Sequence, residues 1–84
     1  MYQFYLTFRS MTRAQSAATA LLRKGIVAAF LRTPKSLSAQ GCGYALQIDG
    51  ASLQTAAAFL RREGLTFDHA FRLYPGAPPQ EVPL

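Results

Sequence analysis

The sequence predicts an α+β domain in which two strand–helix–strand units share one antiparallel sheet. Several segments alternate between apolar and polar residues, which is typical of strands with one buried face. Two stretches rich in alanine and leucine carry apolar residues at helical spacing, and a glycine follows each of them. The two stretches align at a constant offset of 39 residues, so that Gly64 is equivalent to Gly25.

The first unit begins with a strand over residues 2–9, where aromatic and polar residues alternate. Thr12 and Gln15 have the spacing of a capping box and predict the start of a helix. Gly25 supplies a left-handed stop for that helix, and the apolar run over residues 26–32 predicts the second strand. The apolar stripe of the helix consists of Ala14, Ala17, Ala18, Leu21 and Leu22.

The second unit repeats this order. Alternation predicts a strand over residues 44–49, and Ser52 is the expected N-cap of a second helix, which ends at Gly64. A last strand is predicted over residues 67–74. The stripe of the second helix consists of Leu53, Ala56, Ala57 and Leu60.

Two such units combine into the split βαβ arrangement, βαββαβ. We therefore predict a ferredoxin-like fold, a four-stranded antiparallel sheet with both helices on one face. The alanine-rich helix faces allow the two helices to lie close to the sheet. The single domain is expected to occupy residues 1–75, and residues 76–84, which contain three prolines, are expected to form a disordered tail.

The composition excludes several classes of protein. A chain of 84 residues accommodates one small domain, and its single cysteine, Cys42, excludes an internal disulfide. With one histidine, His69, and four acidic residues, most enzyme classes are disfavoured, and we expect no cofactor and no bound metal. The net charge of +5 permits an anionic partner. Without a signal-peptide pattern or a long apolar stretch, a cytoplasmic location away from membranes is expected.

The connection over residues 33–43 is longer than a hairpin requires, and long loops often carry function. It holds Cys42 between Gly41 and Gly43, which allow another molecule to approach the sulfur closely. Backbone N–H groups and nearby cations would favour the thiolate, the nucleophilic form. A lone cysteine is also a common packing residue, and the glycines equally suit a β-bulge, so both interpretations stay open. The predicted supporting residues are Arg32, Lys35, Ser36 and Ser38.

The segment PKSLSAQGCGYAL, from Pro34 to Leu46, resembles the corresponding segment of a small bacterial family of selenium/sulfur carrier-like proteins. The order of strands, helix and loop is similar to that family over residues 2–74, whereas the proline-rich tail has no counterpart there. The resemblance implies that Cys42 accepts sulfur or selenium from a donor such as a cysteine desulfurase. The cargo would be held as a persulfide or selenopersulfide and passed to an acceptor protein. By the same resemblance, the surroundings of the family cysteine correspond to Pro34, Ser38 and Gly43.

Two other functions are compatible with the predicted fold. An ACT-like regulatory or adaptor module would bind a small ligand or a protein partner at a sheet edge or dimer interface. An RNA-binding module would stack bases on sheet aromatics, but the basic-aromatic string of such modules is missing, which argues against nucleic acid. His69 is predicted on the apolar face of the last strand as a structural residue, with Asp68 on the other face. Tyr5 and Tyr74 indicate an open sheet face, which a homodimer would cover.

Overall fold

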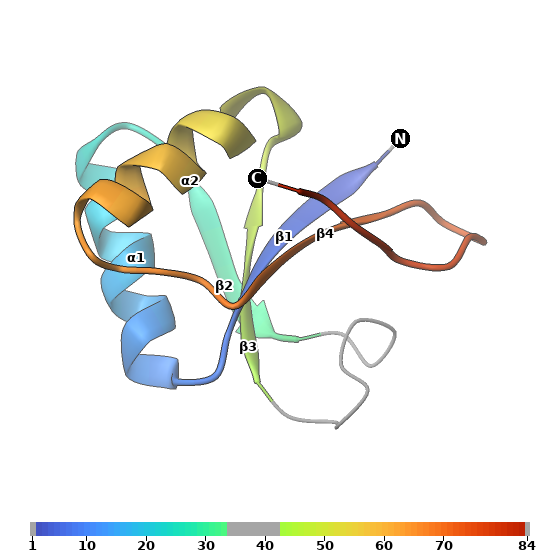
Figure 1. Cartoon of the computed structure of the whole chain (residues 1–84), viewed down its shortest axis with the longest axis horizontal. Coiled ribbons are helices and arrows are strands. Elements are labelled where there is room, and N and C mark those ends of the chain that lie inside the picture. The colour runs from blue at the N-terminus through green and yellow to red at the C-terminus, as the bar shows by residue number, and fades with distance from the viewer. Residues whose placement is uncertain (1, 34–42, 84) are drawn as a thin grey trace.

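The computed structural model describes residues 2–33 and 43–83 of the chain. Two α-helices and five strands make up this part, together with a single turn of 3-10 helix (Figure 1). In chain order they are β1 (Gln3–Phe8), α1 (Met11–Arg23), β2 (Ala28–Arg32), β3 (Tyr44–Ile48), η1 (Gly50–Ser52), α2 (Leu53–Arg62), β4 (His69–Leu73) and β5 (Gln80–Glu81).

The strands form one sheet in the order β2-β3-β1-β4-β5, and every neighbouring pair is antiparallel. Both helices lie on the same side of this sheet (Figure 1). The central strand β1 pairs with strands of the second unit on both sides, so that Leu6 lies opposite Leu46 and Ala70. The α+β class predicted from the sequence is therefore confirmed.

The expected count of four strands is wrong, because β5 extends the sheet beyond β4. Residues Gln80 and Glu81 pair with β4, and the Val82 N–H donates to the Ala70 carbonyl at 2.8 Å. Val82 also packs against the main core. The strand comes from the segment for which the sequence predicts disorder. The prolines flank residues 80–82 and leave these backbone N–H groups free to donate.

The main core lies between the helices and the sheet. Its largest fully buried side chains are four leucines, one each from β1, α1, β3 and α2: Leu6, Leu21, Leu46 and Leu60. Buried alanines on the inner helix faces allow this close approach, since they present little more than a methyl group to the sheet: Ala14, Ala17, Ala56 and Ala57. The predicted stripes of both helices thus face the core, except that Leu22 is 63% exposed.

The helix ends follow the sequence prediction at the glycines but not at the first cap. Gly25 and Gly64 both have positive φ, at 84° and 73°, as the left-handed stop requires. The N-cap of α1 is Ser10, whose Oγ accepts from the Arg13 N–H at 3.3 Å, so the capping box predicted at Thr12 is wrong. The helix begins earlier because the chain turns out of β1 directly into it.

The face of the sheet away from the helices carries a second, smaller cluster. Tyr5 and Ala45 are buried there, and Leu31, Phe71 and Leu73 pack against them. Tyr5 lies on the sheet face away from the helices, as predicted, but it is buried, with 5% of its surface exposed. Tyr74 is 45% exposed. In residues 2–33 and 43–83, no helix combines the length and the apolar character that crossing a membrane requires.

Candidate functional site

The candidate site lies at the end of the sheet where β2 stops and β3 starts. Arg32 and Tyr44 form the last register pair of these strands, and beyond them the Thr33 N–H donates to the Gly43 carbonyl at 3.1 Å. The connection that carries the cysteine therefore leaves and returns at adjacent, hydrogen-bonded positions. Five of the predicted site residues lie outside the described part of the chain: Lys35, Ser36, Ser38, Gly41 and Cys42.

Gly43 is required by the backbone itself. Its φ of +127° lies in a region that residues with a side chain rarely adopt. A Cβ atom built on it would lie 3.3 Å from both the Phe8 carbonyl oxygen and the Thr33 Oγ1. This glycine lets the chain enter β3 in close contact with β1 and with the end of β2. At Gly43, the atoms that approach the backbone closely therefore belong to this chain, to Phe8 and Thr33, and not to another molecule.

Thr33 is a site residue that sequence reasoning missed. Its Oγ1 is buried, and among the described residues it has no hydrogen-bond partner. Buried hydroxyl groups are generally hydrogen-bonded, so this oxygen is a buried polar position directly before the cysteine-bearing connection. The available sequence signal was the threonine itself, since this polar residue directly follows the apolar run of the second strand.

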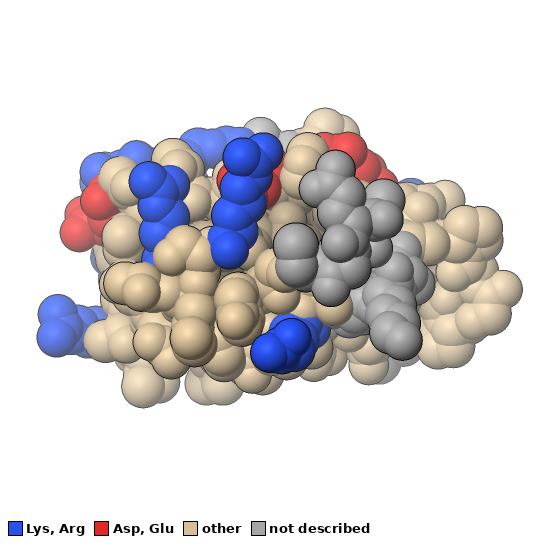
Figure 2. Space-filling view, turned by 90° about the horizontal axis from the view of Figure 1, so that it is seen from below, with Lys and Arg blue, Asp and Glu red and all other residues tan. Residues whose placement is uncertain are grey.

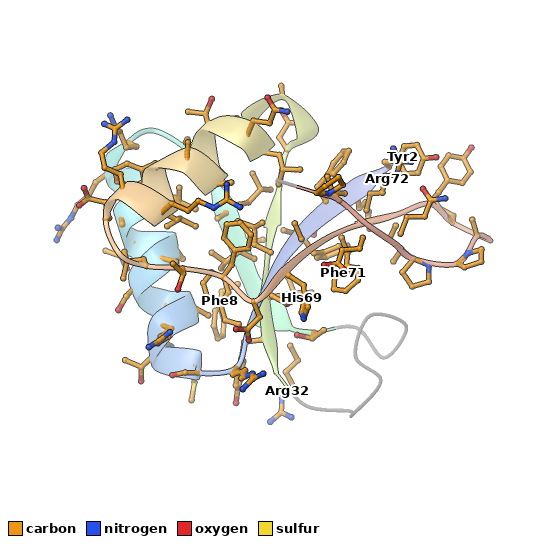
Figure 3. All side chains as sticks on the ribbon, in the orientation of Figure 1. Tyr2, Phe8, Arg32, His69, Phe71 and Arg72 are labelled. Atoms are coloured by element: carbon orange, nitrogen blue, oxygen red, sulfur yellow. The ribbon has the colours of Figure 1, made fainter. Side chains whose placement is uncertain are left out.

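Arg32 supplies positive charge at this end of the sheet. Its side chain is exposed and extends away from the end of the strands (Figure 3). The guanidinium carbon lies 6.0 Å from the centre of the Tyr44 ring, which stacks on Phe30 with 5.6 Å between ring centres. The Tyr44 ring supports the arginine from one side, and the charge of the exposed guanidinium remains in water.

A small hollow lies at the same end of the sheet, where β1 passes into α1 and the chain approaches β4. Arg9 and Arg13 line it, and neither was singled out in the sequence. Arg9 Nε lies 3.5 Å from an Asp68 carboxylate oxygen. The signal available in the sequence was a pair of arginines, one at the end of the first predicted strand and one four residues later. The hollow is lined by Phe8, Arg9, Ser10, Arg13, Thr66 and Asp68.

His69 lies at the surface rather than on a buried face. Its Nδ1 is 3.0 Å from a carboxylate oxygen of Glu81, and its ring lies 5.8 Å from Phe71 on the face opposite the helices. The sequence placed His69 and Phe71 on one face correctly but did not predict the Glu81 partner. Residues 2–33 and 43–83 bring together no three His, Cys, Asp or Glu side chains that would hold a metal ion.

Fold and site together define a small α+β protein whose cysteine-bearing connection leaves a basic end of the sheet. A family model described as "Putative Se/S carrier protein-like" matches residues 3–72, and the chain belongs to this family. The resemblance noted in the sequence is thereby confirmed, and Cys42 falls within the matched span. No curated protein and no solved structure matches the chain.

Proposed function

We propose that this protein carries sulfur or selenium on Cys42 and delivers it to an acceptor protein. The observation that carries the proposal is the family match over residues 3–72, which includes the only cysteine of the chain. Two features of the described site support it. Gly43 holds one end of the connection at β3, and Arg32 places a cation at the other end.

The proposed chemistry is a sulfur transfer between thiols. The Cys42 thiolate attacks the terminal sulfur of a persulfide on the donor, such as a cysteine desulfurase. A bond forms between Cys42 Sγ and that sulfur, the sulfur–sulfur bond of the donor breaks, and the donor thiolate leaves with the electron pair. Delivery repeats the exchange with an acceptor thiolate as the nucleophile. No external oxidant or reductant is consumed, and selenium would follow the same path as a selenopersulfide.

The surroundings of the cysteine have a defined role in this proposal. Cations stabilise a thiolate relative to a thiol, and Arg32 and Lys35 would act in this way. Hydroxyl groups of Ser36 and Ser38 would donate hydrogen bonds to the anionic sulfur or its cargo, and Gly41 would leave room for the partner. Because the chain has no second cysteine, the cargo cannot be lost through an internal disulfide.

The fold and location belong to the same proposal. We infer a ferredoxin-like domain with an added edge strand, since β2-β3-β1-β4 with antiparallel neighbours is the order that two interleaved βαβ units produce. A carrier of this kind requires a reduced thiol, so a cytoplasmic location is part of the proposal.

Intact-mass spectrometry tests the proposal. The protein is incubated with a cysteine desulfurase and either cysteine or selenocysteine, from which the desulfurase forms a persulfide or a selenopersulfide on its own cysteine. Cys42→Ser and Ser38→Ala are treated in the same way. We expect the mass of one sulfur or selenium atom to be added to the wild type, lost on reduction and absent from Cys42→Ser. Ser38→Ala should load more slowly but completely. A folded wild type with a free thiol that gains neither element would contradict the carrier function and favour the ACT-like adaptor.

A further inference from the structure

We propose that the basic end of the sheet is the docking surface for the protein that donates the sulfur, and that it recognises an acidic surface around the donor's reactive cysteine. This basic end is formed by Arg9, Arg13 and Arg32. The inference rests on the proposed carrier function and adds a partner surface to it. Three observations support it: the placement of these arginines, the balance of charged groups around them, and the burial and stacking of the neighbouring aromatic rings.

Arg32 lies at the same end of the sheet as Arg9 and Arg13, although it is distant from them in sequence. Arg9 follows β1 and Arg13 lies in the first turn of α1, and both line the same hollow of about 300 Å³. Phe8, at the rim of that hollow, lies opposite Tyr44 in the sheet, and Arg32 lies opposite Tyr44 on its other side. Figure 2 shows basic side chains spread over this end of the molecule. Thr33 and Gly43, the described ends of the cysteine-bearing connection, lie at the same sheet end.

The charge at this end is only partly balanced by carboxylates of the described residues, in which Arg9 alone of the three arginines is seen in an ion pair. Asp68 is the one acidic residue among those lining the hollow, and it contacts Arg9. That contact is between exposed groups, since the Arg9 side chain is 92% exposed, so its charge remains available to a partner. Another carboxylate, that of Glu81, contacts His69 instead. Arg13 and Arg32 are exposed. A cluster of like charges attracts an oppositely charged surface over about 10 Å at 0.1 M salt.

The aromatic rings at this end favour a protein over a nucleic acid as the partner. Proteins that bind single-stranded nucleic acid combine basic grooves with exposed rings on which bases stack. Here Phe8 is 3% exposed, and the half-buried Tyr44 ring stacks on Phe30 and lies 6.0 Å from the Arg32 guanidinium carbon. Phe30 is 40% exposed, but it is already stacked on Tyr44. Carboxylates on a protein surface need only the guanidinium groups, which bind them in a bidentate manner.

Charge-reversal variants test the docking surface. Arg9→Glu and Arg13→Glu are combined, because both arginines line the hollow and neither has a role in the proposed thiol chemistry. The double variant is compared with Arg23→Glu, an exposed arginine in the last turn of α1, far from the hollow. An acidic residue in the first turn of α1 is favourable for the helix, so loss of docking in the double variant cannot be ascribed to unfolding of α1. Each protein is loaded from a cysteine desulfurase of net negative charge and, separately, from cysteine persulfide, which is too small to span the arginines.

The double variant should load from the desulfurase about tenfold more slowly at low salt, and added salt should remove this difference. Its loading from cysteine persulfide and the behaviour of Arg23→Glu should match the wild type within about twofold. Equal loss with both donors, or no loss with either, would overturn the docking surface. So would a single-stranded RNA oligonucleotide that binds the same arginines while desulfurase loading is unchanged.

Desulfurase binding is also measured in a Cys42→Ser background, where no transfer occurs. Weaker binding on reversal of Arg9 and Arg13 there would support the surface even if Cys42 carried no cargo. Unchanged binding would overturn it even if Cys42 loaded normally. The docking surface and the carrier chemistry therefore fail separately.

Discussion

The two strand–helix–strand units are nearly equivalent where their helices end. They differ where their helices begin and at their outer strands. At the end of α1, the Ile26 N–H donates to the Leu21 carbonyl at 2.9 Å. At the end of α2, 39 residues later, the Leu65 N–H donates to the Leu60 carbonyl at the same distance. Both helices thus end in the same six-residue hydrogen-bonded loop around a glycine.

The units differ at the helix starts and at their outer strands. The α1 helix has a side-chain cap from Ser10, whereas α2 is entered through the turn η1 and Ser52 makes no side-chain cap bond. Strand β4 pairs with β5 on its outer side, whereas β2 is the other edge of the described sheet. The repeated local sequence gives both helices the same end. The segments that pack or pair with each unit in the tertiary structure, such as β5 beside β4, differ between the units.

The largest expected effect comes from the equivalent leucines of the two helices. Leu21 and Leu60 are both fully buried, so Leu21→Ala and Leu60→Ala should each lower the free energy of unfolding by about 2 to 5 kcal/mol. Urea denaturation measures both. Leu22→Ala is the control, because Leu22 is 63% exposed and its loss should cost about 0.5 kcal/mol or less. A large effect in only one helix would break the equivalence of the units.

The next effect concerns the stop glycines. A Cβ on Gly25 or Gly64 would meet no atom within 4 Å, so each change to alanine tests backbone conformation alone. Gly25→Ala and Gly64→Ala should each cost about 1 to 2 kcal/mol, because a residue with a side chain is strained at positive φ. Thermal unfolding of the two variants should agree. The Asn variants should lose less, since asparagine tolerates this conformation better.

The helix starts should separate the units. Ser10→Ala removes a side-chain cap and should cost about 1 kcal/mol of stability. Ser52→Ala removes no cap bond and should leave the free energy of unfolding nearly unchanged. Ser10→Asp, which keeps an acceptor, is the matched control and should retain the wild-type stability. Equal losses at Ser10 and Ser52 would show that the second helix has a cap in solution.

The smallest effect is expected at the outer edge of the second unit. Glu81→Gln removes the charge beside His69 and should change stability by less than about 0.5 kcal/mol, because both side chains are more than half exposed. The Val82 N–H, which donates to Ala70, should exchange somewhat faster with deuterium. Glu63→Gln, at the end of α2, makes the same charge change and should leave that exchange rate unaltered.

Much of the fold was predictable because its causes are local. The alternation in β1 correctly separates Leu6, which faces the helices, from Tyr5, which faces the other side. The sequence did not predict β5, a strand of only two residues. Gln80 and Glu81 have no apolar alternation of their own, and they form a strand only because β4 offers a free edge.

The candidate site was predictable only in part. Gly43 and Arg32 lie at the ends of the connection, as the sequence indicated, but Gly43 is required by contacts with Phe8 and Thr33 that no local pattern reveals. The role of Cys42 stays a prediction, since this residue lies outside the described part of the chain.

The sequence by itself determined the two helices, their glycine stops and the four longer strands, because period and turn chemistry act between residues close along the chain. It also identified the family through the residues around Cys42. Only the tertiary structure decided that β5 joins β4 and that Arg9, Arg13 and Arg32 lie at the same end of the sheet. Such groupings depend on strand register and on where the chain turns. Those are set by the packing of the whole core rather than by any one segment.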